Sequence, residues 1–340
     1  FFVILELLFV FGATRFLGIL LEPIMRPLFK VPGAGAFALV AGYTSGSPSG
    51  GIFTASLYKE GQIRRGEAAR LLAFVNNASP LFILGSVTIG FLEQPQLGWL
   101  LAFSHYVANL LIGFCLSFFL PEKSATIKDY TIKTLFPQAL KKMYYTYRSN
   151  LKPFGNLLAE ASKASTEKIL LIGGFVIIFS VFLEILSIIG LLSFLAKILS
   201  FLLMFFGIDT QLALPLANGL IEMTIGIKMI TASGAPLFQQ LLCISFILGW
   251  AGLAIHAQVA AFTSEYRIPL NLFYLARLLQ GVLAALFTAF AYQGIPVLKK
   301  HYLNPSIWEF TFTFNKLTFV ITFLIINLSV IKNRLTKGKR

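Results

Sequence analysis

The sequence is poor in charged residues. Only 12% of its 340 residues are Asp, Glu, Lys or Arg, whereas a soluble domain carries about 25%. Hydrophobic residues make up 57%, and the mean hydropathy is +0.79. Several apolar runs reach the roughly 20 residues that cross the core of a bilayer. These features exclude a soluble fold and predict an all-α, polytopic membrane protein.

Residues that carry chemistry are equally scarce. The chain has three histidines without metal-ligand spacing and two cysteines, both inside apolar runs. It contains no HExxH, P-loop or G-x-S-x-G motif. We therefore expect no enzymatic activity, no cofactor and no metal site.

Acidic residues are half as numerous as basic ones, 14 against 28, which gives a net charge of +14. The basic residues cluster in loops between apolar runs, and this pattern indicates cytoplasmic loops and anionic membrane lipids rather than nucleic acid. The segment 121–168 holds nine basic residues against four acidic ones, including the basic-aromatic stretch KKMYYTYR. We expect a membrane-surface connector there, and a regulatory or partner site is the alternative. The chain opens inside an apolar run without Met or a basic start, so we expect no signal peptide and a native N-terminus that lies further upstream.

The apolar runs predict membrane spans at roughly 1–18, 68–92, 97–120, 169–192, 237–257, 268–292 and 309–331. Two more runs, 32–58 and 209–236, are interrupted by Gly, Pro and polar residues, and each follows a charge-bearing apolar segment, 20–30 or 194–206. We expect those preceding segments to be interfacial helices. Irregular backbone survives at membrane depth only when protein or a water-filled cavity surrounds it, so the interrupted runs predict re-entrant helical hairpins. Hairpins that span fully are the alternative.

The two halves of the chain repeat. HYVANLLIGFCLSFF (105–119) resembles FYLARLLQGVLAALF (273–287), and SPLFILGSV (79–87) resembles CISFILGWA (243–251). A unit with a re-entrant hairpin crosses three times, so the second unit is predicted to be inverted, with the more basic side in the cytoplasm. The predicted division is a first repeat, a basic connector, a second repeat and a C-terminal helix with a basic tail, at 1–120, 121–168, 169–292 and 293–340.

The stretch GYTSGSPSGG (42–51) predicts the tip of the first hairpin, because glycines allow tight turns and a half-helix N-terminus favours anions. Its counterpart, ANGLIEMTIGIKMI (217–230), places charges at membrane depth, where they are functional by default. Helices around both tips add further polar groups. The candidate solute-binding residues are Ser45, Gly46, Ser47, Ser49, Gly50, Asn76, Asn77, Ser79, Asn218, Glu222, Thr224, Lys228, His256, Gln258 and Arg277.

Each of these assignments has a structural alternative. The Gly/Ser stretch is also typical of close helix packing in membranes, and Lys228 can snorkel to the interface. His256 can be a hydrogen-bonded structural residue. Glu222 can pair with Lys228, given a helix break near Gly226, or receive a coupling proton. Arg277, at the repeat position of Asn109, needs Glu222 or the solute as its partner.

Five stretches carry a resemblance to a known family: RFLGILLEPIMRPLFKVPGAGAF (15–37), KEGQIRRGEAARLLAFVNNASPLFILGSV (59–87), SHYVANLLIGF (104–114), GLIEMTIGIK (219–228) and GWAGLAIHAQV (249–259). Together they resemble the YlbJ-like sporulation integral membrane proteins. That family belongs to the nucleoside-recognition or Gate domain group, which is distantly similar to concentrative nucleoside transporters. The match extends over nearly the whole chain.

The resemblance implies a secondary transporter of an endospore-forming bacterium, placed in the mother-cell-derived outer forespore membrane. Its implied solute is dipicolinic acid, pyridine-2,6-dicarboxylate, moved by alternating access at a midplane site and coupled to protons or Na⁺, with homo-oligomers possible. A nucleoside or nucleobase carrier is one alternative. A non-transporting scaffold of spore-envelope assembly, acting through 121–168, is another.

Overall fold

The computed structural model describes residues 2–119, 132–149 and 152–294, and throughout these ranges the regular structure is helical. The predicted span 309–331 lies outside the described residues. The elements in chain order are α1 Phe2–Val10, α2 Ala13–Leu20, α3 Glu22–Phe29, α4 Gly35–Thr44, α5 Ser49–Lys59, α6 Arg65–Val75, the π-helix η1 Leu81–Phe91, the short η2 Pro95–Leu97, α7 Gly98–Phe119, α8 Ile132–Ser149, α9 Phe154–Ile188, α10 Leu191–Phe205, the short η3 Thr210–Leu212, α11 Ala213–Ile221, α12 Met223–Thr231, α13 Leu237–Trp250, α14 Gly252–Ser264 and α15 Asn271–Gly294.

Four helical stretches in the described residues are long and apolar enough to cross a membrane. They are Pro95–Phe118, Phe154–Ile188, Leu237–Ser264 and Asn271–Tyr292. A fifth is possible if α1 and α2 count together, but these two helices meet at an angle of 76°. The chain turns at Gly12, whose φ of +84° suits glycine. The predicted span over 1–18 is therefore a bent pair of helices, which together remain apolar enough to cross a membrane.

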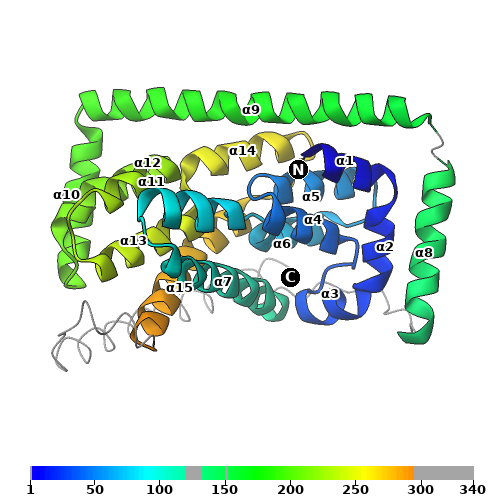
Figure 1. The fold of residues 1–340 in the computed structure, drawn as a ribbon, viewed down its shortest axis with the longest axis horizontal. Helices are drawn as coiled ribbons and strands as arrows, with labels where there is room; N and C mark the ends of the chain where they lie inside the picture. The colour runs from blue at the N-terminus through cyan, green and yellow to red at the C-terminus, as the bar shows by residue number, and fades with distance from the viewer. Residues whose placement is uncertain (1, 120–131, 150–151, 295–340) are drawn as a thin grey trace, which may run out of the picture.

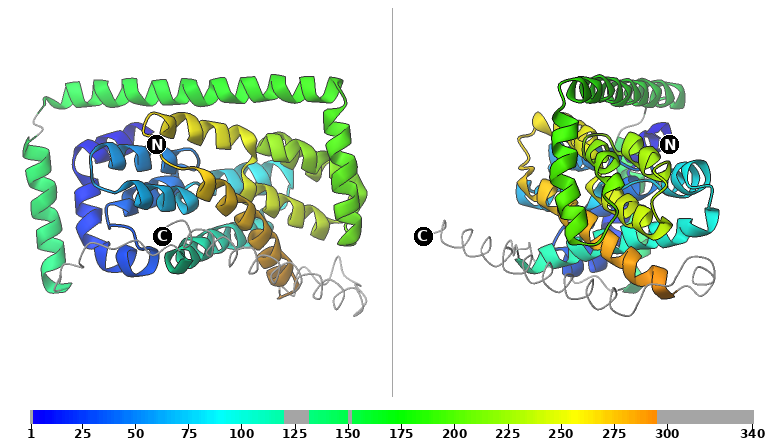
Figure 2. Two further views of the ribbon diagram at one scale, coloured as in Figure 1. Left: turned by 180° about the vertical axis from the view of Figure 1, so that it is seen from behind. Right: turned by 90° about the vertical axis from the view of Figure 1, so that its left-hand side faces the viewer.

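The long helix α9 frames the molecule. It runs along one edge of the bundle, and α8 and α10 stand at right angles to it at its two ends (Figure 1; Figure 2). Its 35 residues extend over about 52 Å, and only 11% of its most apolar stretch is buried. A bilayer crossed by α9 along its axis would have α8 at one surface and α10 at the other.

The two halves share one order of elements. A short helix, α3 or α10, precedes a pair of short helices, α4–α5 or α11–α12. A broken helix follows, α6–η1 or α13–α14, and then a long one, α7 or α15. The predicted interfacial segments 20–30 and 194–206 thus coincide with α3 and α10. Figure 1 shows α4 and α5 on the side of the bundle near α2, and α11 and α12 on the opposite side near α10.

The first broken helix departs from its predicted span, whereas the second lies within one stretch, Leu237–Ser264, that is long and apolar enough to cross a membrane. The helix expected over 68–92 ends at Val75 and resumes as η1 only at Leu81, so an unbroken span there is wrong. Pro80 has no N–H to donate into a preceding turn, which favours such a break. The span expected over 237–257 turns at Ala251, where φ is +71°. The two FILG stretches are not equivalent, because one begins after its break and the other ends before it.

Close packing joins the long helix of each half to the broken helix of the same half. A Cβ at Gly249 of α13 would lie 2.6 Å from the Cα of Gly281 in α15. A Cβ at Gly113 of α7 would lie 2.8 Å from the ring of Phe74 in α6. Small residues allow such approach between membrane helices. The long helices α7 and α15 therefore pack against the broken helices, and their polar residues reach the breaks.

Candidate functional site

The two interrupted segments form helical hairpins. A Cβ at Gly42 of α4 would lie 3.3 Å from the Cα of Gly50 in α5 and 1.6 Å from the carbonyl oxygen of Val75. In the second hairpin, a Cβ at Gly226 of α12 would lie 2.1 Å from the Cα of Gly219 in α11. Glycine is required at these positions because backbone occupies the space that a side chain would need.

The tip of the first hairpin meets the break between α6 and η1. The N–H of Ser47 donates to the carbonyl oxygen of Asn77 at 2.7 Å. The N–H of Gly51, in the first turn of α5, donates to Oδ1 of Asn76 at 2.9 Å. Two irregular segments thus satisfy part of each other's backbone hydrogen bonds inside the protein.

Four polar atoms at this junction remain unpaired. They are buried, and none of them makes a hydrogen bond within 3.5 Å to the described part of the chain, although the Tyr43 hydroxyl lies near the amide of Asn77. We name this set the tip cluster: the hydroxyls of Ser45, Ser47 and Ser49 and the Nδ2 group of Asn77. The remaining predicted residues of this region lie close by, since a Cβ at Gly46 would be 3.1 Å from the Cβ of Ser79.

Arg277 of α15 contacts the same junction between the first hairpin and the break after α6. Its fully buried guanidinium donates to the carbonyl oxygens of Asn76 and, at 2.7 Å, of Ala73. These carbonyls have no helical N–H partner because α6 ends at Val75. A third bond joins it to Oδ1 of Asn109 at 2.8 Å, so the two equivalent repeat positions touch. No carboxylate pairs with Arg277 among the described residues, so its positive charge is met by two backbone carbonyls, the amide oxygen of Asn109 and the ring of Phe273. Of the two partners predicted for Arg277, Glu222 or the solute, the described structure does not pair it with Glu222.

Three neighbours of the tip cluster were not predicted from the sequence as solute-binding residues. His105 of α7 accepts from the N–H of Ala78 at 3.2 Å, and Gln280 of α15 donates to Oδ1 of Asn77 at 3.1 Å. The hydroxyl of Tyr43 accepts from Asn109 at 2.7 Å. The sequence spacing could have indicated these neighbours. His105 and Asn109 lie on one face of α7, and Arg277 and Gln280 lie on one face of α15.

The tip of the second hairpin is a single residue. Glu222 is extended, with φ −132° and ψ 115°, and its carboxylate accepts from the N–H groups of Thr224 at 3.0 Å and Ile225 at 2.7 Å. This carboxylate caps the N-terminus of α12. Lys228 lies six residues on, about 9 Å along the helix, with its side chain exposed. The predicted Glu222–Lys228 pair does not form, because the break falls at Glu222 and not near Gly226.

The break between α13 and α14 meets this second tip. The indole N–H of Trp250 donates to the carbonyl oxygen of Leu220 at 2.9 Å. His256 bonds the carbonyl oxygen of Trp250 through Nε2 at 2.8 Å and packs on the indole with ring centroids 4.3 Å apart. Its ring also contacts Phe273, over which the Arg277 guanidinium lies at 5.8 Å. His256 therefore holds the break and links the two tips.

Two predicted residues remain to be located. Asn218 donates from Nδ2 to the carbonyl oxygen of Leu214 at 2.9 Å, one turn back in its own helix. Gln258 of α14 is buried. In the described ranges no group of three or more His, Cys, Asp or Glu side chains could hold a metal ion.

Two cavities lie away from both tips. One, of about 420 Å³, is lined at the far end of η1 and α12 by residues that include Leu92, Thr231 and Gln240. The other, of about 560 Å³, lies between α1, α2, α8 and the end of α5. A solute could reach the tip cluster only if the helices around it moved.

Comparison with known proteins places the chain in a family. It is 42% identical over 291 residues, 84% of this chain and 71% of the relative, to the sporulation integral membrane protein YlbJ of Bacillus subtilis. A shorter match, 35% over 89 residues, covers 26% of this chain and 19% of an uncharacterised protein of Alkalihalophilus pseudofirmus. No family model matches the chain, and no solved structure matches it. The identity and coverage of the first match show that this chain belongs to the YlbJ family of sporulation integral membrane proteins.

Proposed function

We propose that the chain is a secondary transporter for dipicolinate in the outer forespore membrane, with the tip cluster as the site for a solute carboxylate. Membership of a family of sporulation membrane proteins supports the setting. The hairpins and broken helices support transport, because many secondary transporters bind their solutes at discontinuous helices.

The observation that carries the proposal is the unpaired tip cluster. A buried polar group without a partner costs about 1–3 kcal/mol, so four of them together call for a ligand. A carboxylate offers about four lone-pair sites and accepts from hydroxyl and amide donors. The N-terminus of α5 carries partial positive charge. The buried guanidinium of Arg277 is also near, because it donates a hydrogen bond to the carbonyl oxygen of Asn76, the residue before Asn77.

The arrangement of the two halves supports alternating access. The hairpins lie on opposite sides of the bundle (Figure 1), and Asn109 contacts Arg277, its repeat equivalent. Contact between equivalent positions is what a pseudo-two-fold axis between inverted units produces. Glu222 supplies a site for a coupling proton, since protonation would weaken its hold on the N-terminus of α12.

Uptake of labelled dipicolinate into proteoliposomes that contain the full-length protein tests the proposal. We expect the S45A/S47A/S49A triple variant to lose uptake. The matched control, S180A/S187A/S193A on α9 and α10, removes three serines distant in sequence from the tip and should transport normally. Equal uptake by both variants would contradict the assignment of the solute to the tip cluster. No uptake by folded wild-type protein would favour the scaffold role.

A nucleoside carrier is the second candidate, and one observation favours it. A dianion should require Lys228 or Arg277, yet Lys228 is exposed and three bonds of the Arg277 guanidinium are made to the protein. Hydroxyls and an amide would equally suit an uncharged solute. Competition separates the candidates, because excess uridine should leave dipicolinate uptake unchanged if the anion is the true solute.

A further inference from the structure

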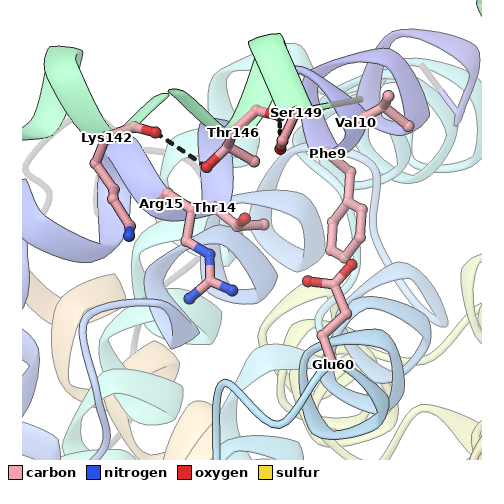
Figure 3. Close-up of a pocket in the computed structure, with 8 residues that line it drawn as sticks. All are labelled: Phe9, Val10, Thr14, Arg15, Glu60, Lys142, Thr146 and Ser149. Carbon is pink, nitrogen blue, oxygen red and sulfur yellow. Dashed lines mark hydrogen bonds between the residues drawn. The ribbon is translucent and has the colours of Figure 1, made fainter. Parts of the chain in front are cut away.

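We propose that the cavity between α1, α2, α8 and the end of α5 binds the phosphate of an anionic phospholipid. Its volume is about 560 Å³, and Figure 3 shows the eight side chains that line it. The cavity is separate from both hairpin tips, so the proposal does not depend on the transported solute.

Two cationic side chains line the cavity and would bind the phosphate. Arg15 comes from α2 and Lys142 from α8, and neither side chain forms a hydrogen bond or ion pair with any described residue. Figure 3 shows both side chains extending from their helices into the cavity. A guanidinium beside an ammonium is the usual donor set for a phosphate.

The other polar groups of the lining set the charge that fits. The hydroxyls of Thr146 and Ser149 donate to carbonyl oxygens of their own helix, at 2.9 and 2.8 Å. Glu60 lies across the cavity in Figure 3 and forms no ion pair with Arg15 in the described structure. Two cations and one carboxylate leave a net charge of +1, which complements a phosphodiester of charge −1. Glu60 can accept from hydroxyl groups of the headgroup, and phosphatidylglycerol combines both features.

The surroundings favour a lipid over free phosphate. Phe9 and Val10 of α1 form an apolar wall beside the cations. Helix α8 lies across one end of α9, where the membrane surface is expected (Figure 1). It also exposes Tyr144, Tyr145 and Tyr147, residues typical of the headgroup region. A bound lipid would bridge α2 and α8 and dock the basic connector on the first half of the protein.

Native mass spectrometry of the full-length protein, titrated with phosphatidylglycerol, phosphatidylethanolamine or phosphatidylcholine in detergent, tests the site. A basic residue at a membrane surface contributes about 1 kcal/mol, so each of R15Q and K142Q should weaken phosphatidylglycerol binding about fivefold. The charge-preserving R15K/K142R should bind as the wild type does, which separates loss of charge from loss of fold. K141Q is the matched control, since Lys141 is the neighbour of Lys142, does not line the cavity and lies 6.0 Å over the ring of Tyr145.

Four results would overturn the proposal. Equal weakening by K141Q would indicate diffuse attraction to a basic surface. Binding of phosphatidylcholine as tight as that of phosphatidylglycerol would exclude charge recognition. Stronger binding of phosphatidylethanolamine, lost in E60Q, would assign the cavity to a zwitterionic headgroup. Displacement of the lipid by millimolar inorganic phosphate would assign it to a free anion.

Discussion

The two hairpins each present the N-terminus of a half-helix at a break in the backbone, and they differ in what meets it. In the second hairpin the carboxylate of Glu222 caps α12 with two hydrogen bonds. In the first, no side chain of the tip caps α5, and the neutral amide of Asn76 reaches a single N–H. Three serine hydroxyls beside it remain unpaired.

This difference indicates that the two hairpin tips have different roles. The second tip already contains the anion that its helix N-terminus favours, so it is complete without a solute. The first tip has the donors without the anion. We therefore expect substitutions at the second tip to change stability, and substitutions at the first tip to change solute binding.

The largest effect should come from the glycines that both hairpins share. G42A and G226A each place a methyl group on backbone atoms, within 1.6 and 2.1 Å. Forced overpacking costs 1–3 kcal/mol or more, and here backbone must move, so we expect a loss of at least about 3 kcal/mol. Thermal unfolding followed by size-exclusion chromatography measures it. G173A is the control, because nothing lies within 4 Å of its added Cβ.

Removal of Arg277 should come next. R277M leaves the carbonyl oxygens of Ala73 and Asn76 without their donor, and we expect a loss of about 2–6 kcal/mol at about 1–3 kcal/mol per unpaired group. Hydrogen exchange should rise around the break after α6. R148M, exposed on α8, should stay within about 0.5 kcal/mol of wild type. Unchanged hydrogen exchange at the break after α6 would contradict the expectation that Arg277 stabilises it.

The second tip should show a smaller loss of stability. E222A removes the cap of α12, and loss of an N-cap costs about 0.5–2 kcal/mol. E222Q keeps an acceptor for one of the two N–H groups and should lose less. Chemical denaturation in detergent, compared with K228A as the exposed control on the same helix, provides the measurement. A K228A loss as large as that of E222A would show that Lys228 has a structural role.

The first tip should show no loss of stability. S45A/S47A/S49A removes buried hydroxyls that have no partner, so stability should not fall by more than about 0.5 kcal/mol and should increase, since each unpaired group costs about 1–3 kcal/mol. The same denaturation experiment reports it. A loss above about 2 kcal/mol would mean that these hydroxyls hold the fold, and the two hairpins would then not differ as described.

Much of this architecture could be predicted from the sequence, because apolar run length fixes spans and Gly, Ser and Pro fix interruptions. The positions of contacts between distant segments could not. Arg277 reaches α6 across about 200 residues of sequence, and composition alone does not show that helix carbonyls would be its partners. The break at Glu222 could not be placed from the sequence, because an extended backbone and a self-capping carboxylate leave no glycine or proline signal.

Calorimetric titration of dipicolinate against three proteins tests the division between the tips most directly. Wild type and E222Q should bind with similar affinity. S45A/S47A/S49A should bind at least about 100-fold more weakly, since each hydrogen bond to a charged group contributes about 1.5–3 kcal/mol. Loss of binding in E222Q together with full binding by the triple serine variant would contradict the account and place the solute at the second hairpin.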